Sequence, residues 1–109
     1  MSSQPPKLYL CGPMTGIEHL NHPAFNQAAL ALRCWGYQVF NPAENGLPSD
    51  APWATHMRVD IVQLMQCEAV ALLPGWENSK GAALETHIAN QLGMIIKNHE
   101  NWISEARQI

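Results

Sequence analysis

The chain has 109 residues, 47% of them hydrophobic and 14% charged, with a formal net charge of −3. This composition predicts one compact domain with a buried core and argues against a disordered or acidic tail. The six Lys and Arg residues form no basic surface for a long nucleic acid, and no apolar run reaches the roughly 18 residues that cross a bilayer, so we expect neither nucleic acid nor membrane as a partner.

Residues 1–6 are polar and end in two prolines, which predicts a mobile N-terminal segment ahead of a single domain at residues 7–109. Residues 8–11 form an apolar run that is typical of a strand buried on both faces, and a Gly-Pro turn ends it. Apolar side chains at helical spacing then predict a helix over residues 23–33.

Residues 37–40 predict a second strand. Residues 41–53 are rich in Pro, Gly, Asn and Asp and predict a long loop, which is either functional or a surface detour. A second helix is expected over residues 55–66, where apolar side chains again lie on one stripe. The apolar run at residues 69–73 predicts a third buried strand.

A third helix is expected over residues 79–92, followed by a fourth strand at 94–96 and a polar helix around 101–107. The alternation of strands and helices predicts an α/β fold, a three-layer Rossmann- or flavodoxin-like sandwich with a parallel sheet of four to five strands. Ligands of such sheets bind beyond the carboxyl ends of the strands, so we expect the site in the loops found there.

Glu85 lies on the apolar stripe of the third predicted helix. On a helical projection, four apolar residues fall within about 60° of it: Ala82, Ile88, Ala89 and Leu92. Burying a carboxyl group costs several kcal/mol unless partners compensate it. Glu85 is therefore either paired with an arginine such as Arg58, or placed at the edge of the stripe, or a candidate for catalysis.

Asp60 is the second candidate acid, because it flanks the apolar stripe of the second predicted helix. It either reaches the same pocket or bonds to Arg58 or a loop amide. Two carboxyl groups beside one sugar carbon supply a nucleophile and a proton donor. Ser79, Lys80 and Gly81 precede the third helix, where Ser79 serves as its N-cap, as part of an anion site, or as both.

The remaining motifs mainly exclude particular kinds of binding site. The turn at residues 12–16 is neither a dinucleotide-binding nor a Walker motif, although its glycines let a ligand approach. Five histidines without metal-ligand spacing lead us to expect no metal and no cofactor. Trp53 and Trp76 either stack a base or seal a core margin. The cysteines are expected to be buried thiols of a reducing compartment, and hence of a cytoplasmic protein: Cys11, Cys34 and Cys67.

Four segments together resemble the nucleoside 2-deoxyribosyltransferase superfamily over residues 7–97. They are Tyr9 to Gly16 (YLCGPMTG), Met57 to Asp60 (MRVD), Leu73 to Trp76 (LPGW) and Ser79 to Glu85 (SKGAALE). More closely, the pattern resembles the DUF4406-like branch of that superfamily, and it is similar to 2′-deoxynucleoside 5′-monophosphate N-glycosidases.

The resemblance implies that Glu85 is the nucleophile that attacks C1′ of the sugar, that Asp60 assists the departing base and that Tyr9 orients the Glu85 carboxylate. A serine at position 79, where the deoxyribosyltransferases have an acid, favours a hydrolase of monophosphates over a transferase. The expected substrate-binding residues are Gly12, Pro13, Met14, Gly16, Trp76, Ser79 and Gly81.

We therefore expect an enzyme acting on the N-glycosidic bond of a 2′-deoxynucleotide or deoxynucleoside through a glycosyl-enzyme intermediate. The alternative is a non-catalytic nucleotide-binding module, either a sensor or an interaction domain. The resemblance also implies a homodimer or higher homo-oligomer in which a neighbouring subunit completes the pocket. No residue of 98–109 can be matched to that contribution.

Overall fold

The computed structural model describes residues 4–108 and contains one parallel sheet of four strands. In spatial order the strands are β2 (Val39–Phe40), β1 (Leu8–Cys11), β3 (Ala69–Leu72) and β4 (Ile95–Asn98). Residues 1–3 of the expected mobile segment lie outside the described residues, and residues 4–6 have no regular secondary structure. The predicted α/β fold with a parallel sheet is confirmed.

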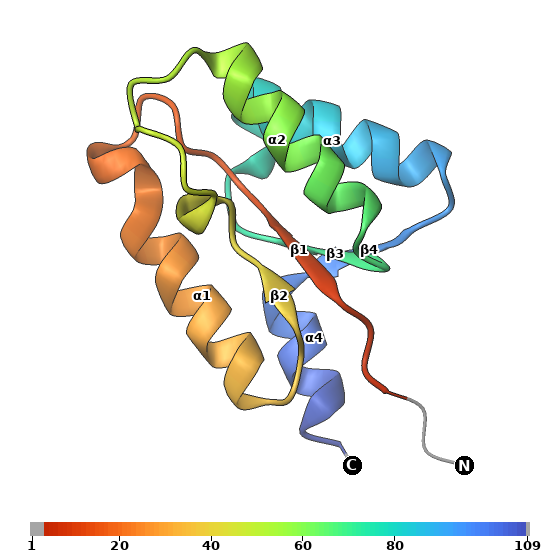
Figure 1. Ribbon diagram of the computed structural model, residues 1–109. Coiled ribbons are helices and arrows are strands. Elements are labelled where there is room, and N and C mark those ends of the chain that lie inside the picture. The colour runs from red at the N-terminus through yellow and green to blue at the C-terminus, as the bar shows by residue number, and fades with distance from the viewer. Residues whose placement is uncertain (1–3, 109) are drawn as a thin grey trace.

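Helices cover both faces of this sheet, which makes three layers (Figure 1). The α-helices are α1 (His22–Cys34), α2 (Trp53–Met65), α3 (Lys80–Gln91) and α4 (His99–Ala106). Three short 3₁₀ turns are η1 (Glu18–Asn21), η2 (Pro42–Glu44) and η3 (Trp76–Asn78). Helices α1 and α4 pack on one face, whereas α2 and α3 pack on the other. Among residues 4–108, no helix has both the length and the apolar character that crossing a membrane requires.

Strand β1 lies inside the sheet and is buried on both faces. Its side chains alternate, so Leu8 and Leu10 belong to the core under α1 and α4, while Tyr9 and Cys11 belong to the core under α2 and α3. All four side chains are fully buried. This explains why the segment reads as a continuous apolar run without alternation.

The order of the strands places a topological switch point between β1 and β3. The chain leaves β1 for β2 on one side and later returns to β3 on the other side. Gly12 directly follows β1 here, and a Cβ atom on it would lie 2.8 Å from the Cβ of Leu73. Only a glycine therefore fits beside the end of β3, and the loops after both strands meet at one edge.

Some details of the expected elements need correction. Leu92 is not on the buried stripe but is 62% exposed, because it is the C-cap residue at which the chain turns toward β4. Thr86 is buried in its place, and its hydroxyl group reaches the carbonyl of Ala82. Cys34 is exposed at the end of α1 rather than buried. Helix α4 begins at His99, directly after β4, two residues earlier than expected.

Candidate active site

A cavity of about 310 Å³ opens at the carboxyl edge of the sheet. Its walls come from the end of β1 with the loop after it, from η1 and the start of α1, from η2 and the loop that leads to α2, and from the first turns of α2 and α3. The volume is at the lower end of the range of small-molecule pockets, about 300 to 1,000 Å³. No Lys or Arg is among the described residues that line it.

Glu85 forms part of the cavity wall and is only 6% exposed. It projects from α3 toward β1, where two side chains donate to it. The Tyr9 hydroxyl donates to Oε2 at 2.5 Å, and the Cys11 thiol lies 3.5 Å from Oε1. Tyr9 and Cys11 are two residues apart on one strand and therefore point to the same face. Each carboxylate oxygen thus has its own donor from β1.

Within the part of the chain that the structure describes, no cation pairs with the Glu85 carboxylate. Among residues 4–108, none of the ion pairs involves Glu85 or Arg58, and Arg58 is exposed on α2. The interpretation of Glu85 as the partner of Arg58 is therefore wrong. The pKa of Glu85 is raised from 4.5 to about 7, because burial and, to a smaller extent, the negative charge of Asp60 raise it more than the bonds from Tyr9 and Cys11 lower it.

Asp60 reaches the same cavity from α2 and is 7% exposed. The side-chain amide of Asn45, in the loop after β2, donates to its Oδ1 at 3.0 Å. Burial raises the pKa of Asp60, while the Asn45 bond and the nearby His56 lower it. Two expectations for Asp60 hold together, since it bonds to a loop amide and also lines the pocket.

Asn45 bonds through both ends of its side-chain amide, with Oδ1 inside the loop and with Nδ2 to α2. The backbone N–H of Leu47 donates to Oδ1 at 3.0 Å, which identifies that atom as the oxygen. Its Nδ2 then faces both Asp60 and Nδ1 of His56, each at 3.0 Å. Since Nε2 of His56 lies 3.0 Å from the carbonyl of Pro48, the proton belongs on Nε2, and Nδ1 is the acceptor.

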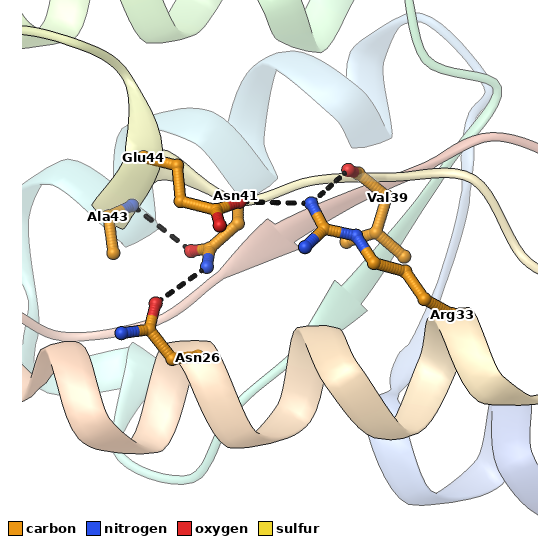
Figure 2. A network of polar contacts seen from close by, with 6 residues as sticks. All are labelled: Asn26, Arg33, Val39, Asn41, Ala43 and Glu44. Atoms are coloured by element: carbon orange, nitrogen blue, oxygen red, sulfur yellow. Dashed lines mark hydrogen bonds and ion pairs between the residues drawn. The ribbon is translucent and has the colours of Figure 1, made fainter.

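A second polar cluster holds the start of this loop against α1 (Figure 2). Asn41 is 2% exposed; its Nδ2 donates to Asn26 at 2.9 Å, and its Oδ1 accepts from the backbone N–H of Ala43 at 3.0 Å. Arg33 donates to Glu44 at 3.0 Å and to a carbonyl of β2. These bonds fix η2 and so determine where Asn45 enters the cavity.

The start of α3 supplies the polar part of the opposite wall. Ser79 is the N-cap and accepts from the backbone N–H of Ala82 at 3.2 Å, as one of the two expected roles requires. Among the described residues, the backbone N–H groups of Lys80 and Gly81 have no acceptor. The Lys80 ammonium group lies over the Trp53 ring, 4.2 Å from its centroid. Of these two residues Gly81 lines the cavity, which therefore has a free backbone donor at this end.

The cavity brings together seven of the ten residues expected from the sequence: Tyr9, Gly12, Met14, Asp60, Ser79, Gly81 and Glu85. The other three do not line it. Pro13 is buried against Gly75, and Gly16 is an exposed turn residue with a φ of +83°. Trp76 packs on the core under α2 and α3. It therefore seals a core margin, whereas Trp53 lines the cavity.

Sequence reasoning missed three residues that shape the site. Asn45 and His56 were not predicted as site residues because the loop after β2 has no regular sequence pattern. The length of this loop and its place after a strand were nevertheless signs of a functional loop. Cys11 was interpreted only as a core thiol, since nothing in the local sequence shows that Glu85 lies beside it. Its separation from Glu85 is 74 residues. Among residues 4–108, no group of three or more His, Cys, Asp or Glu residues could hold a metal ion.

Comparison with known proteins gives one family match. No curated protein matches the chain. The model of one protein family, described as a domain of unknown function (DUF4406), matches residues 6–98. This match includes all four strands, α1 to α3 and every residue named above as lining the cavity. Because it spans most of the sequence, the chain belongs to the DUF4406 family.

Proposed function

We propose that the protein cleaves the N-glycosidic bond of a 2′-deoxynucleotide or deoxynucleoside, with Glu85 as the nucleophile. The main support is the environment of Glu85, a buried carboxyl group on a cavity wall with a hydrogen-bond donor at each oxygen and no cation. A carboxyl group held in this way is costly for the fold, and catalysis is a common reason for retaining one. The resemblance to the nucleoside 2-deoxyribosyltransferase superfamily supports the choice of the N-glycosidic bond as the bond that is cleaved.

In the first step an oxygen of the ionised Glu85 carboxylate forms a bond to C1′ of the sugar. The bond from C1′ to the base nitrogen breaks, its electron pair leaves with the base, and Asp60 gives its carboxyl proton to the base. Burial raises the pKa of Asp60, which favours the protonated form that this role needs. Tyr9 stays bonded to the carboxyl group of the resulting ester.

In the second step water attacks C1′ and gives a proton to the Asp60 carboxylate. The ester bond breaks, and its electron pair returns to Glu85, so both acids recover their starting states. The sum of the two steps is deoxynucleotide plus water to free base plus deoxyribose phosphate. If a second base replaced the water, the product would be a new deoxynucleotide, or a new deoxynucleoside where the substrate has no phosphate.

A 5′-phosphate on the substrate is favoured by the start of α3. Two free backbone N–H groups and the Ser79 hydroxyl lie at the N-terminal end of this helix, where the helix dipole attracts an anion. The serine at this position also resembles the monophosphate N-glycosidases rather than the transferases. We therefore place hydrolysis of a monophosphate ahead of base exchange.

The test is to incubate the protein with each deoxynucleoside 5′-monophosphate and each deoxynucleoside, and to measure free base by chromatography. Glu85→Gln should lower base release by about 1,000-fold or more, because the nucleophile is lost. Glu77→Gln is the matched control, since Glu77 is exposed on η3. It should leave the rate within about twofold of the wild type.

Mass spectrometry of the quenched reaction should find a deoxyribosyl phosphate adduct on the peptide that contains Glu85. Adding a second base separates the reactions, since a new deoxynucleotide or deoxynucleoside indicates transfer. Tight binding of nucleotides without base release would favour the non-catalytic binding module. If the protein neither binds any deoxynucleotide or deoxynucleoside nor releases a base from one, both functions are refuted.

A further inference from the structure

The Cys11 thiol is the second donor to the Glu85 carboxylate, and it differs from Tyr9 in its position. Tyr9 lines the cavity, whereas Cys11 is fully buried and does not line it. Cys11 therefore lies behind the carboxyl group, out of reach of a substrate. Burial raises the pKa of Cys11 well above its ordinary value, so the sulfur keeps its proton and acts as a donor.

This thiol has one proton and two acceptors within reach. Its sulfur lies 3.5 Å from Oε1 of Glu85 and 3.6 Å from the backbone carbonyl oxygen of Ala82. Ala82 and Glu85 are three residues apart on α3, so the two acceptors lie on the same side of the helix. A small rotation of the S–H bond moves the proton from one acceptor to the other without moving the sulfur.

The Ala82 carbonyl can receive the thiol without leaving another group unpaired. The Thr86 hydroxyl lies 2.9 Å from this oxygen but also 3.0 Å from the carbonyl oxygen of Ala83. Thr86 can therefore turn to Ala83 when the thiol turns to Ala82. In the structure, no buried side-chain nitrogen or oxygen atom of the described residues lacks a hydrogen-bond partner.

We propose that Cys11 is a positioning residue whose thiol bonds to Oε1 of Glu85 while the carboxylate is charged and turns to the Ala82 carbonyl when the charge is lost. A charged oxygen is the stronger acceptor, which explains the first state. Protonation or bonding to a sugar carbon removes that charge and favours the second. No covalent bond to sulfur forms or breaks, and the thiol proton stays on Cys11. The part that concerns the sugar rests on the proposed function, whereas the response to protonation does not.

A thiol suits this position because it is a weak donor. A strong donor holds a carboxylate firmly but lowers its basicity, and with it its reactivity toward carbon. Tyr9 already supplies one strong bond to Oε2. The second bond, from Cys11, fixes the plane of the carboxyl group at a smaller cost to its reactivity.

Infrared spectroscopy tests the proposal without any substrate, because the S–H stretch lies where no other protein group absorbs. The difference spectrum between the wild type and Cys11→Val isolates the Cys11 band. We expect this band to move to lower frequency as the pH rises through about 7, and to stay constant in the same comparison made on a Glu85→Gln background. A band that does not move between about pH 5 and pH 9 would overturn the proposal.

Carbon NMR of the Glu85 carboxyl, assigned by its loss in Glu85→Gln, gives a second measurement. Cys11→Val enlarges the side chain and Cys11→Ala shortens it, but both remove the donor, so both should raise the pKa of Glu85 by about 0.5 or more. Cys67→Val is the control, since Cys67 is a buried thiol of the same core cluster without a contact to Glu85. It should leave the pKa of Glu85 unchanged.

The titratable groups around the Glu85 carboxyl are Tyr9 and Cys11 from β1 and Asp60 from α2. If the enzyme is active, Cys11→Val should lower kcat/KM about threefold on the acid side of the profile and much less on the basic side. A Glu85 pKa equal to that of the wild type in both Cys11 variants refutes the positioning role. A raised pKa in a protein that releases no base would keep the role of Cys11 and refute only the proposed function.

Discussion

At the scale of single residues, Glu85 combines a costly position with two compensating bonds. Its carboxylate is almost out of contact with water, and desolvation is the largest influence on its pKa. The bonds from Tyr9 and Cys11 favour the charged form, but they do not overcome the burial. The result is a carboxyl group that titrates near neutral pH, with both its charged and its neutral form present there.

The pKa of Glu85 makes the stability of the fold depend on pH. Because this pKa is higher in the folded chain than in the unfolded chain, the contribution of Glu85 is complete below about pH 4.5 and is lost as the pH rises through about 7. The loss amounts to about 3 kcal/mol in the free energy of unfolding. Glu85→Gln removes the titrating carboxyl group and with it this loss. The free energy of unfolding of the variant should therefore rise relative to that of the wild type between about pH 5 and pH 9.

Urea unfolding curves at a series of pH values, followed by circular dichroism, measure this gain. Glu77→Gln provides the baseline, because Glu77 is exposed and its replacement should not change the pH dependence. Equal pH dependence in the wild type and Glu85→Gln would mean that Glu85 titrates as it does in water.

Asn45 joins the loop after β2 to two polar residues of α2, Asp60 and His56. Its replacement by Ala leaves Asp60 and His56 without their common donor. We expect Asn45→Ala to lower the free energy of unfolding by about 1–3 kcal/mol and to raise the pKa of Asp60 further. Chemical denaturation and NMR titration measure the two effects. Asn101→Ala, at an exposed position of α4, should change neither.

At the scale of elements, the first turn of α3 combines a structural role with a proposed binding role. Ser79 caps the helix through the backbone N–H of Ala82, and we propose that its hydroxyl also meets a phosphate. The two roles need different chemistry. A cap needs only an acceptor oxygen, whereas phosphate binding needs a donor and tolerates no negative charge.

Replacing Ser79 by Ala and by Asp separates these roles. Ser79→Ala should lower the free energy of unfolding by about 1 kcal/mol, whereas Ser79→Asp retains a cap and should keep the stability of the wild type. Both should weaken binding of a deoxynucleoside monophosphate, and Ser79→Asp more strongly because of charge repulsion. Thermal unfolding and titration calorimetry provide the two measurements. Unchanged monophosphate binding by Ser79→Asp would exclude Ser79 from the phosphate site.

At the scale of the whole molecule, α4 covers the face of the sheet opposite α2 and α3. Trp102 is 4% exposed, and its indole N–H donates to the carbonyl of Val70 at 2.9 Å. The hydroxyl of Tyr37 donates to the carbonyl of Trp102 at 2.7 Å. These two bonds connect α4 with the centre of the sheet and with the segment before β2.

Trp102→Phe removes the indole donor and part of the packed volume. We expect a decrease of about 1–3 kcal/mol in the free energy of unfolding. Trp35→Phe is the control, since Trp35 is 47% exposed, and it should change stability by less than about 0.5 kcal/mol. Urea unfolding measures both variants. Trp102 does not line the cavity, so any base release by folded Trp102→Phe should equal that of the wild type.

The amino-acid sequence by itself determined the order of the elements, the parallel sheet and the position of Glu85 on a buried stripe. These features depend on local periodicity, because apolar runs indicate buried strands and spacings of three and four residues indicate helices. Local patterns were less reliable at element ends. Leu92 has the correct spacing for the stripe, but it lies where α3 ends and the chain turns away from the core.

Only the tertiary structure decided which side chains meet in the cavity. The Cys11 donor and the Glu85 carboxylate are 74 residues apart, and the link between Asn45 and Asp60 depends on how an irregular loop is fastened to α1 and α2. Tertiary packing also separated Trp53, which lines the cavity, from Trp76, which does not. The physical reason is that side-chain contacts depend on strand register and helix packing, which bring distant segments together and leave no local trace in the sequence.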